Sequence, residues 1–156
     1  MKYLKLWATI LFLCHIQSFF AQEKTDKRIP KKVYNTKRTE IAPQIDGQLN
    51  DEVWNSVSWD GNFSQWEPNE GSKPTQDTKF KILYDAKNLY IAVRCFDTDP
   101  SKIVSRLSRR DGFDGDWIEV NIDSYHDFRT GFSFTITAAG VKGDEAISAN
   151  GGGWDR

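Results

Sequence analysis

The sequence predicts an all-β protein, an antiparallel β-sandwich of the jelly-roll or immunoglobulin-like kind. Several segments alternate apolar and polar residues with a period of two, as strands do when one face is buried. Short stretches rich in Gly, Asp and Asn separate them, which is typical of turns. No long segment shows the 3.6-residue period of an amphipathic helix, and this disfavours α/β architectures. The length of 156 residues suits one domain.

The first expected element is a short helix that follows a turn at Gly47. Asn50 is placed to cap it, and Val53, Trp54 and Val57 form its apolar side. The helix should therefore lie on the sheet with Trp54 buried.

A β-hairpin is expected next, with the loop 85–88 joining strand 80–84 to strand 89–96. Alternation divides the second strand into two faces, Leu89, Ile91, Val93 and Cys95 on one and Tyr90, Ala92, Arg94 and Phe96 on the other. We expect the aliphatic face to meet the core. Cys95 is then a small buried side chain and not a nucleophile.

Two further strands are expected at 117–123 and 132–138. Ile118, Val120 and Ile122 share one face of the first strand. In the second, Phe132, Phe134, Ile136 and Ala138 should point inward, and Ser133, Thr135 and Thr137 outward.

The N-terminus predicts an exported protein. Lys2 and Lys5 precede the apolar run 6–20, and Ala21 precedes a polar stretch, which is the layout of a secretory signal peptide over 1–21. The run is short and broken for a membrane span. Residues 22–40 are expected to be a polar, basic linker, which leaves 41–156 for the sandwich.

The C-terminal segment 151–156 is rich in glycine and is expected to be a loop. A sheet that ended before it would have an unpaired edge. We therefore expect an incomplete sandwich, the N-terminal piece of a longer protein.

Composition excludes some functions. A net charge of −1 gives no electrostatic case for nucleic acid, and two His and two Cys leave little material for a zinc site. No Gly-x-Ser-x-Gly or phosphate-binding loop is present, so we expect no catalysis from these residues. A glycosidase needs two carboxylates close together, but a sequence with 22 acidic residues offers many such pairs by chance, so they are weak evidence for that activity. A glycosidase stays an alternative for the longer protein.

The polar faces of the expected strands suit a glycan. Aromatic rings offer flat apolar surfaces to sugars, and Arg, Asn and Glu supply hydrogen bonds to hydroxyl pairs. The candidates on strands are Tyr90, Arg94, Trp117 and Glu119, and those in loops are Trp66, Glu67 and Trp154. The alternative is that these residues pack under a second layer or pair with each other, for example Arg94 with Glu119.

An acidic turn lies at 109–116. Asp111, Asp114 and Asp116 could supply oxygen ligands to calcium, although the spacing is not that of an EF-hand. The alternative is a turn held by local ion pairs with Arg109 and Arg110.

Several of these segments together resemble a family 9 carbohydrate-binding module. The match runs from about Ile41 to Arg156. Its opening is the Ile45-Asp46-Gly47 turn with Leu49 and Trp54, and its hairpin is the run 84–93. Asp116, Glu119, Val120, Ile122 and Asp123 carry a third motif, and the segments 65–71 and 109–111 resemble a subgroup at the head of large envelope proteins.

The resemblance implies a glycan-binding β-sandwich, sometimes with structural calcium, in proteins of polysaccharide breakdown. Related modules grip a sugar between two Trp rings, for which Trp66 and Trp154 are the candidates, and Arg109 joins the candidate binding residues. The implied location is the periplasm, outer membrane or surface of a Gram-negative bacterium. The rivals are a docking domain for a C-terminal outer-membrane β-barrel and part of a glycoside hydrolase, which acts on glycosyl bonds.

Overall fold

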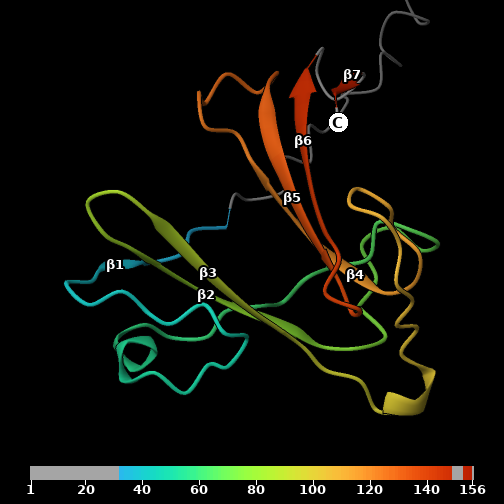
Figure 1. Cartoon of the computed structure of the whole chain (residues 1–156), viewed down its shortest axis with the longest axis horizontal. Coiled ribbons are helices and arrows are strands. Elements are labelled where there is room, and N and C mark those ends of the chain that lie inside the picture. The colour runs from blue at the N-terminus through green and yellow to red at the C-terminus, as the bar shows by residue number, and fades with distance from the viewer. Residues whose placement is uncertain (1–31, 149–152, 156) are drawn as a thin grey trace, which may run out of the picture. The chain divides into compact units, whose positions relative to one another are not determined.

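The computed structural model describes residues 32–148 and 153–155, and it contains two β-sheets (Figure 1). The first sheet has the order β1 (Lys37–Arg38), β2 (Thr78–Tyr84), β3 (Leu89–Cys95). The second has the order β4 (Trp117–Ile122), β5 (Gly131–Thr137), β6 (Lys142–Ser148), β7 (Gly153–Asp155). All neighbours are antiparallel except β1 and β2. The predicted all-β class is confirmed; the expected signal peptide lies outside the described residues.

The β2–β3 hairpin forms with the predicted loop. The carboxylate of Asp85 accepts hydrogen bonds from the backbone N–H groups of Lys87 and Asn88, at 2.6 and 2.7 Å. This local turn fixes Tyr84 opposite Leu89, and the register then places Lys79 opposite Arg94.

The predicted short helix is a 3₁₀ helix, η2 (Glu52–Ser56), which begins after Asp51. Its Trp54 packs with Val57, Leu83 and Ala92 in the buried core of the first sheet. Leu83 is fully buried, with an exposed fraction of 0%. The core therefore lies on the face that carries Tyr90 and Ala92, where the polar, ligand-binding side was expected. The core lies on this face because η2 needs an apolar surface against which to bury Trp54, and Leu83 and Ala92 supply it.

Each sheet has a second, apolar face, which carries Ile91 in the first sheet and Phe134 in the second. These two apolar faces line one cavity of about 720 Å³. Its walls include Ile91 and Val93 from β3 and Ile118, Val120 and Phe134 from β4 and β5. The prediction of which residues share a face is confirmed by the strand register. The expected burial of that face is wrong, because Phe132, Phe134 and Ile136 are 41–51% exposed, whereas Ser133, Thr135 and Thr137 are buried. Cys95 is also exposed and is not a core residue.

Residues 104–116 run against the second sheet. The backbone N–H of Asp116 donates to the carbonyl of Val104 at 2.9 Å, and the ring of Phe113 stacks on Trp117 at 5.7 Å. A Cβ on Gly143 would lie 2.7 Å from the Phe113 ring, so this glycine makes room for it. The segment thus covers part of the face that carries Thr135.

Two C-terminal strands were not predicted. β6 has the sequence of a polar segment, yet it pairs with β5 along six residues. β7 pairs with the last residues of β6, and this contradicts the expected loop. The free backbone groups at the β6 edge explain the pairing, since they accept any extended segment that reaches them. At its other end, β6 is not paired with β7. There the backbone N–H of Asp111 donates to the carbonyl of Lys142, the first residue of β6.

The remaining regular element is the 3₁₀ helix η3 (Pro100–Lys102). Neither η2 nor η3 has the length and apolarity that would let it cross a membrane, and no other helix occurs in the part of the chain that the structure describes.

Candidate functional site

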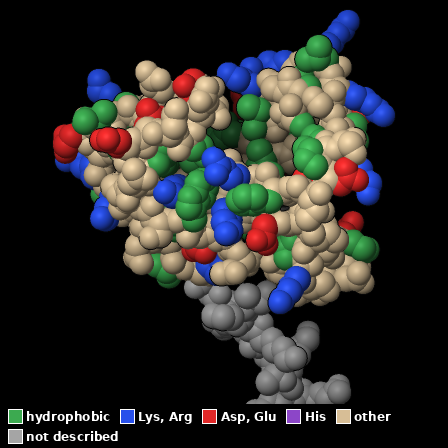
Figure 2. All heavy atoms as spheres, turned by 90° about the horizontal axis from the view of Figure 1, so that it is seen from below, with side chains coloured by type: hydrophobic (Ala, Val, Ile, Leu, Met, Phe, Trp, Pro, Cys, Tyr) green, Lys and Arg blue, Asp and Glu red, His purple; other side chains and the backbone are tan. Residues whose placement is uncertain are grey.

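Basic and aromatic side chains meet on the outer face of the first sheet. The guanidinium of Arg94 lies 5.6 Å from the centre of the Trp59 ring, and the ammonium of Lys81 lies 5.0 Å from it. The ammonium of Lys79 lies 5.7 Å from the Phe96 ring. We call these five residues the basic–aromatic face. Figure 2 shows a side of the molecule on which Lys and Arg side chains lie among hydrophobic ones near its middle.

Two short backbone links hold Trp59 at this face. Its neighbour Asp60 exchanges two backbone hydrogen bonds with Phe80 of β2, at 3.0 and 2.8 Å. Gly61 follows, and a Cβ there would lie 2.7 Å from the Thr78 carbonyl. Because the chain can approach β2 closely here, the Trp59 ring reaches across the sheet to Arg94 on β3. Trp59 is 37% exposed, so part of its ring faces solvent.

The cations at this face have aromatic and carbonyl partners instead of acidic ones. Lys81 is buried and donates to the Trp54 carbonyl at 2.6 Å. Within the described residues, no carboxylate lies within 4 Å of Lys79, Lys81 or Arg94. Cation–π contact over Trp and Phe stabilises such cations without neutralising them. The face therefore combines positive charge with flat apolar surface.

The structure places the predicted binding residues in three regions. Arg94 belongs to the basic–aromatic face, and nearby Tyr90 is engaged, since its hydroxyl donates to the Asp85 carboxylate at 2.6 Å. That bond is the main cause that raises the pKa of the Tyr90 hydroxyl. Trp66 and Glu67 lie in the exposed turn 65–72, where the Trp66 ring is 76% exposed.

The remaining predicted residues belong to the second sheet and its flanking turn. Trp117, on β4, is 50% exposed and stacks on Phe113, while Glu119 is half-buried on the same face. Arg109 is exposed in the preceding turn. Trp154 lies in β7, and its side chain is outside the described part of the structure. Arg94 and Glu119 project from opposite sides of the inter-sheet cavity, so the structure does not pair them.

The three aspartates of the acidic turn do not form a calcium site. Asp111 accepts from the N–H of Asp144 at 3.2 Å, Asp114 pairs with Arg106 at 3.1 Å, and Asp116 accepts from the N–H of Val104 at 3.0 Å. Nowhere in residues 32–148 do three such side chains gather as metal ligands. Because each carboxylate is directed to a different partner, the residues do not fit the ion, and the turn is held by ion pairs, including that of Arg110 with Asp144.

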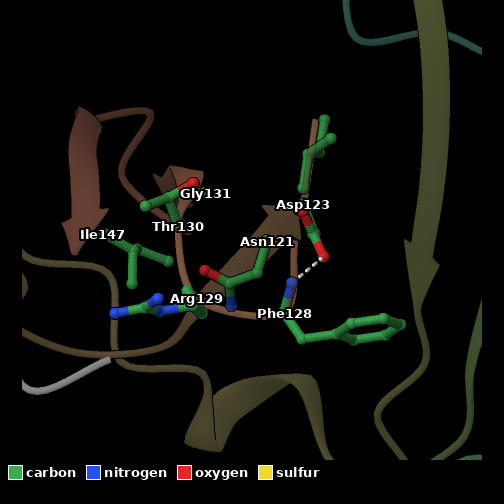
Figure 3. Close-up of a pocket in the computed structure, with 8 residues that line it drawn as sticks. Asn121, Asp123, Phe128, Arg129, Thr130, Gly131 and Ile147 are labelled. Atoms are coloured by element: carbon green, nitrogen blue, oxygen red, sulfur yellow. Dashed lines mark hydrogen bonds between the residues drawn. The ribbon is translucent and has the colours of Figure 1, made fainter. Parts of the chain in front are cut away.

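A smaller pocket of about 250 Å³ lies at the end of the second sheet (Figure 3). Asn121, Arg129 and Ile147 lie near one another there, and the Phe128 ring points away from them (Figure 3). Asp123 organises the turn by accepting the N–H of Phe128 at 2.9 Å. Phe128 has φ of +57°, an uncommon value for a bulky residue. Phe128 is still one of the residues that line the pocket, together with the polar side chains of Asn121, Arg129 and Thr130.

Sequence reasoning missed Trp59, Lys79, Lys81 and Phe96 as members of one surface. The signal was available in the hairpin. The loop 85–88 sets Tyr84 opposite Leu89, and counting back in pairs puts Lys79 opposite Arg94. Only the position of Trp59 needed tertiary structure, because nothing local predicts its bridge to β2.

Comparison with known proteins gives one result that covers most of the chain. Residues 45–153 match the family model described as carbohydrate family 9 binding domain-like. The match contains η2, the β2–β3 hairpin and the basic–aromatic face. No curated protein and no solved structure matches the chain. By the extent of the family match, the chain belongs to the carbohydrate family 9 binding domain-like family.

Proposed function

We propose that the chain is a non-catalytic carbohydrate-binding module of an exported protein and that it binds glycans on the basic–aromatic face. The family match over 45–153 carries this proposal, because carbohydrate binding is the function that the family model describes. The basic start and apolar run of residues 1–21 support export, to the periplasm or to the surface of a Gram-negative cell. Through the rest of a longer protein, the module would bring a polysaccharide to breakdown.

The chemistry of the face supports the location of the site. The partly exposed Trp59 ring presents a flat apolar surface of the kind that stacks on the C–H side of a sugar. Arg94, exposed beside it, has donors in a planar fork that matches pairs of hydroxyl oxygens. Trp66 is a second exposed ring, placed in the 65–72 turn.

Titration calorimetry with a panel of oligosaccharides tests this proposal. We expect binding by the wild type and a loss of roughly 1–3 kcal/mol of binding free energy in Arg94→Ala, a donor to the ligand. Trp66→Ala should also weaken binding, because it removes an exposed stacking surface. Phe128→Ala is the matched control, since its ring is exposed in the turn that joins β4 to β5 of the second sheet. Wild-type protein that binds no sugar would contradict the proposed function.

A specific observation favours a second candidate, a docking domain. Phe132, Phe134 and Ile136 expose one apolar face of β5, of which Phe134 and Ile136 line the inter-sheet cavity. Such faces mark interaction surfaces when nothing covers them. The occupant would be a later segment of the same longer chain. A protein extended beyond Arg156 should then melt at a higher temperature, with Phe134 protected from solvent. An unchanged melting temperature would count against docking. If the extended protein also bound glycans, only the proposal of a carbohydrate-binding module would be supported.

A further inference from the structure

The arrangement of charge on the basic–aromatic face indicates which sugars it selects. Lys79 and Arg94 lie directly opposite each other on β2 and β3, and like charges in that position destabilise a sheet. Some basic residues in the described ranges have acidic partners, since Lys102 pairs with Asp99, Arg106 with Asp114 and Arg110 with Asp144, whereas others, such as the exposed Lys73 and Lys87, form no ion pair there. Lys79 and Arg94 have none among these residues. An anion that bridged the two would remove the repulsion.

The two cations are also positioned before any ligand arrives. Arg94 rests over Trp59 and Lys79 over Phe96, so each is held against a ring. Lys81 adds a third positive charge, buried beneath the Trp59 ring. Asp60, the acid next to Trp59 in the chain, forms no ion pair with any of these three cations among the described residues, and its carboxylate accepts the N–H of Gly61 at 2.6 Å. Positive charge therefore persists beside an exposed ring on a hydrogen-bonded sheet.

Resting on the proposed function, we propose that this face selects anionic glycans, whose sugars carry a carboxylate or a sulfate. Arg94 binds the anion through its planar fork, and Lys79 supplies a second, point-like positive charge on the neighbouring strand. The Trp59 ring takes the apolar side of the same sugar. A neutral sugar could use the ring and the donors but would leave the charges of Lys79 and Arg94 uncompensated. The preference for charge follows from that difference.

The test compares three tetrasaccharides of matched length by titration calorimetry on the whole chain. One is an oligogalacturonate, one is a sulfated galactan and one is a neutral galactan. We expect at least one anionic sugar to bind about tenfold or more tightly than the neutral one, and the ranking of carboxylate and sulfate identifies the anion. The advantage should shrink in 0.5 M salt, because the exposed charges are screened.

Charge-removing variants locate the effect. The double variant Lys79→Gln with Arg94→Gln should lose the preference for the anionic sugars, while its affinity for the neutral sugar falls less. Lys102→Gln with Arg106→Gln is the matched control, since it removes one Lys and one Arg charge from exposed, acid-paired positions. It should keep the preference. Circular dichroism checks that both variants are folded.

Each other outcome overturns the inference. Equal affinity for neutral and anionic sugars contradicts the charge selection and leaves carbohydrate binding intact. A preference that survives the double variant places the selecting charges elsewhere. Oligoglutamate that binds as tightly as the anionic sugars shows that the face recognises charge without sugar. Failure of all three sugars to bind contradicts the proposed function itself and this inference with it.

Discussion

The two sheets differ in which of their faces is covered. The first sheet buries Leu83 and Ala92 under η2 on one face and opens its other face to the inter-sheet cavity. The second sheet opens its regular apolar face, with Phe134 half-exposed, and buries the hydroxyl side chains of Ser133 and Thr135. In both sheets, the face with the strongest aliphatic or aromatic alternation is the less covered one. The difference shows that alternation assigns residues to a face, whereas the flanking segments decide which face is buried.

The largest effect expected from this comparison is in the buried core. Leu83→Ala removes a fully buried side chain and should lower the free energy of unfolding by about 2–5 kcal/mol. Phe134→Ala should cost only about 1 kcal/mol, because half of the side chain is already exposed. Urea denaturation of both variants measures the difference. If both variants lost the same free energy of unfolding, the cavity-facing side would be packed as well as the core around Leu83.

The segment that covers the second sheet depends on Gly115. This residue has φ of +111°, and a Cβ there would lie 2.2 Å from the Val104 carbonyl oxygen. Gly115→Ala should therefore destabilise the protein by about 3 kcal/mol. Gly140→Ala is the control, since φ is also positive, at +79°, but nothing lies within 4 Å of the added carbon. It should cost about 1 kcal/mol. Thermal melts that do not separate the two would contradict the close packing.

Two turn carboxylates, one beside each sheet, should make stability depend on acid. The hydrogen bond from the Tyr90 hydroxyl, with that from the N–H of Lys87, lowers the pKa of Asp85. The N–H groups of Thr130 and Arg129 lower the pKa of Asp127. Because both pKa values are lowered on folding, their stabilisation is present above the unfolded pKa of about 3.9 and is lost as the pH falls through the folded values. Melting temperature against pH, in the wild type and in Asp85→Asn and Asp127→Asn, checks this.

Each Asn variant should have a smaller drop in melting temperature below pH 4 than the wild type. Direct titration of the two carboxyl groups by NMR provides the control, since both should stay ionised at pH values where an ordinary Asp takes up a proton. Wild-type and variant curves with the same slope would contradict the prediction.

The smallest effect is expected at Cys95. Its thiol is exposed at the end of β3, so Cys95→Ser should change the free energy of unfolding by no more than about 0.5 kcal/mol. In the folded protein, a thiol reagent should label Cys95 at nearly the rate of the unfolded chain. Strong protection would mean that an additional layer covers this end of the strand.

The sequence by itself determined the local features of the fold. The loop at 85–88 follows from Asp85, whose carboxylate holds the next backbone N–H groups, and the strands at 117–122 and 131–137 follow from alternation. These features depend on neighbours along the chain, so a local pattern suffices to predict them. Strand β6 escaped prediction because its polar residues carry no alternation of their own, and its pairing with β5 comes from exposed backbone groups.

The tertiary structure decided the burial and the composition of the candidate site. Trp54 and Trp59 are only five residues apart, yet Trp54 fills the core, because η2 packs on the first sheet, and Trp59 faces Arg94, because a bridge between Asp60 and Phe80 holds its neighbour against β2. The predicted candidates Trp117 and Glu119 are on a different sheet from Arg94 and stay predictions. Long-range contacts of this kind are set by how separate segments fill space together, and no local pattern of residues encodes that.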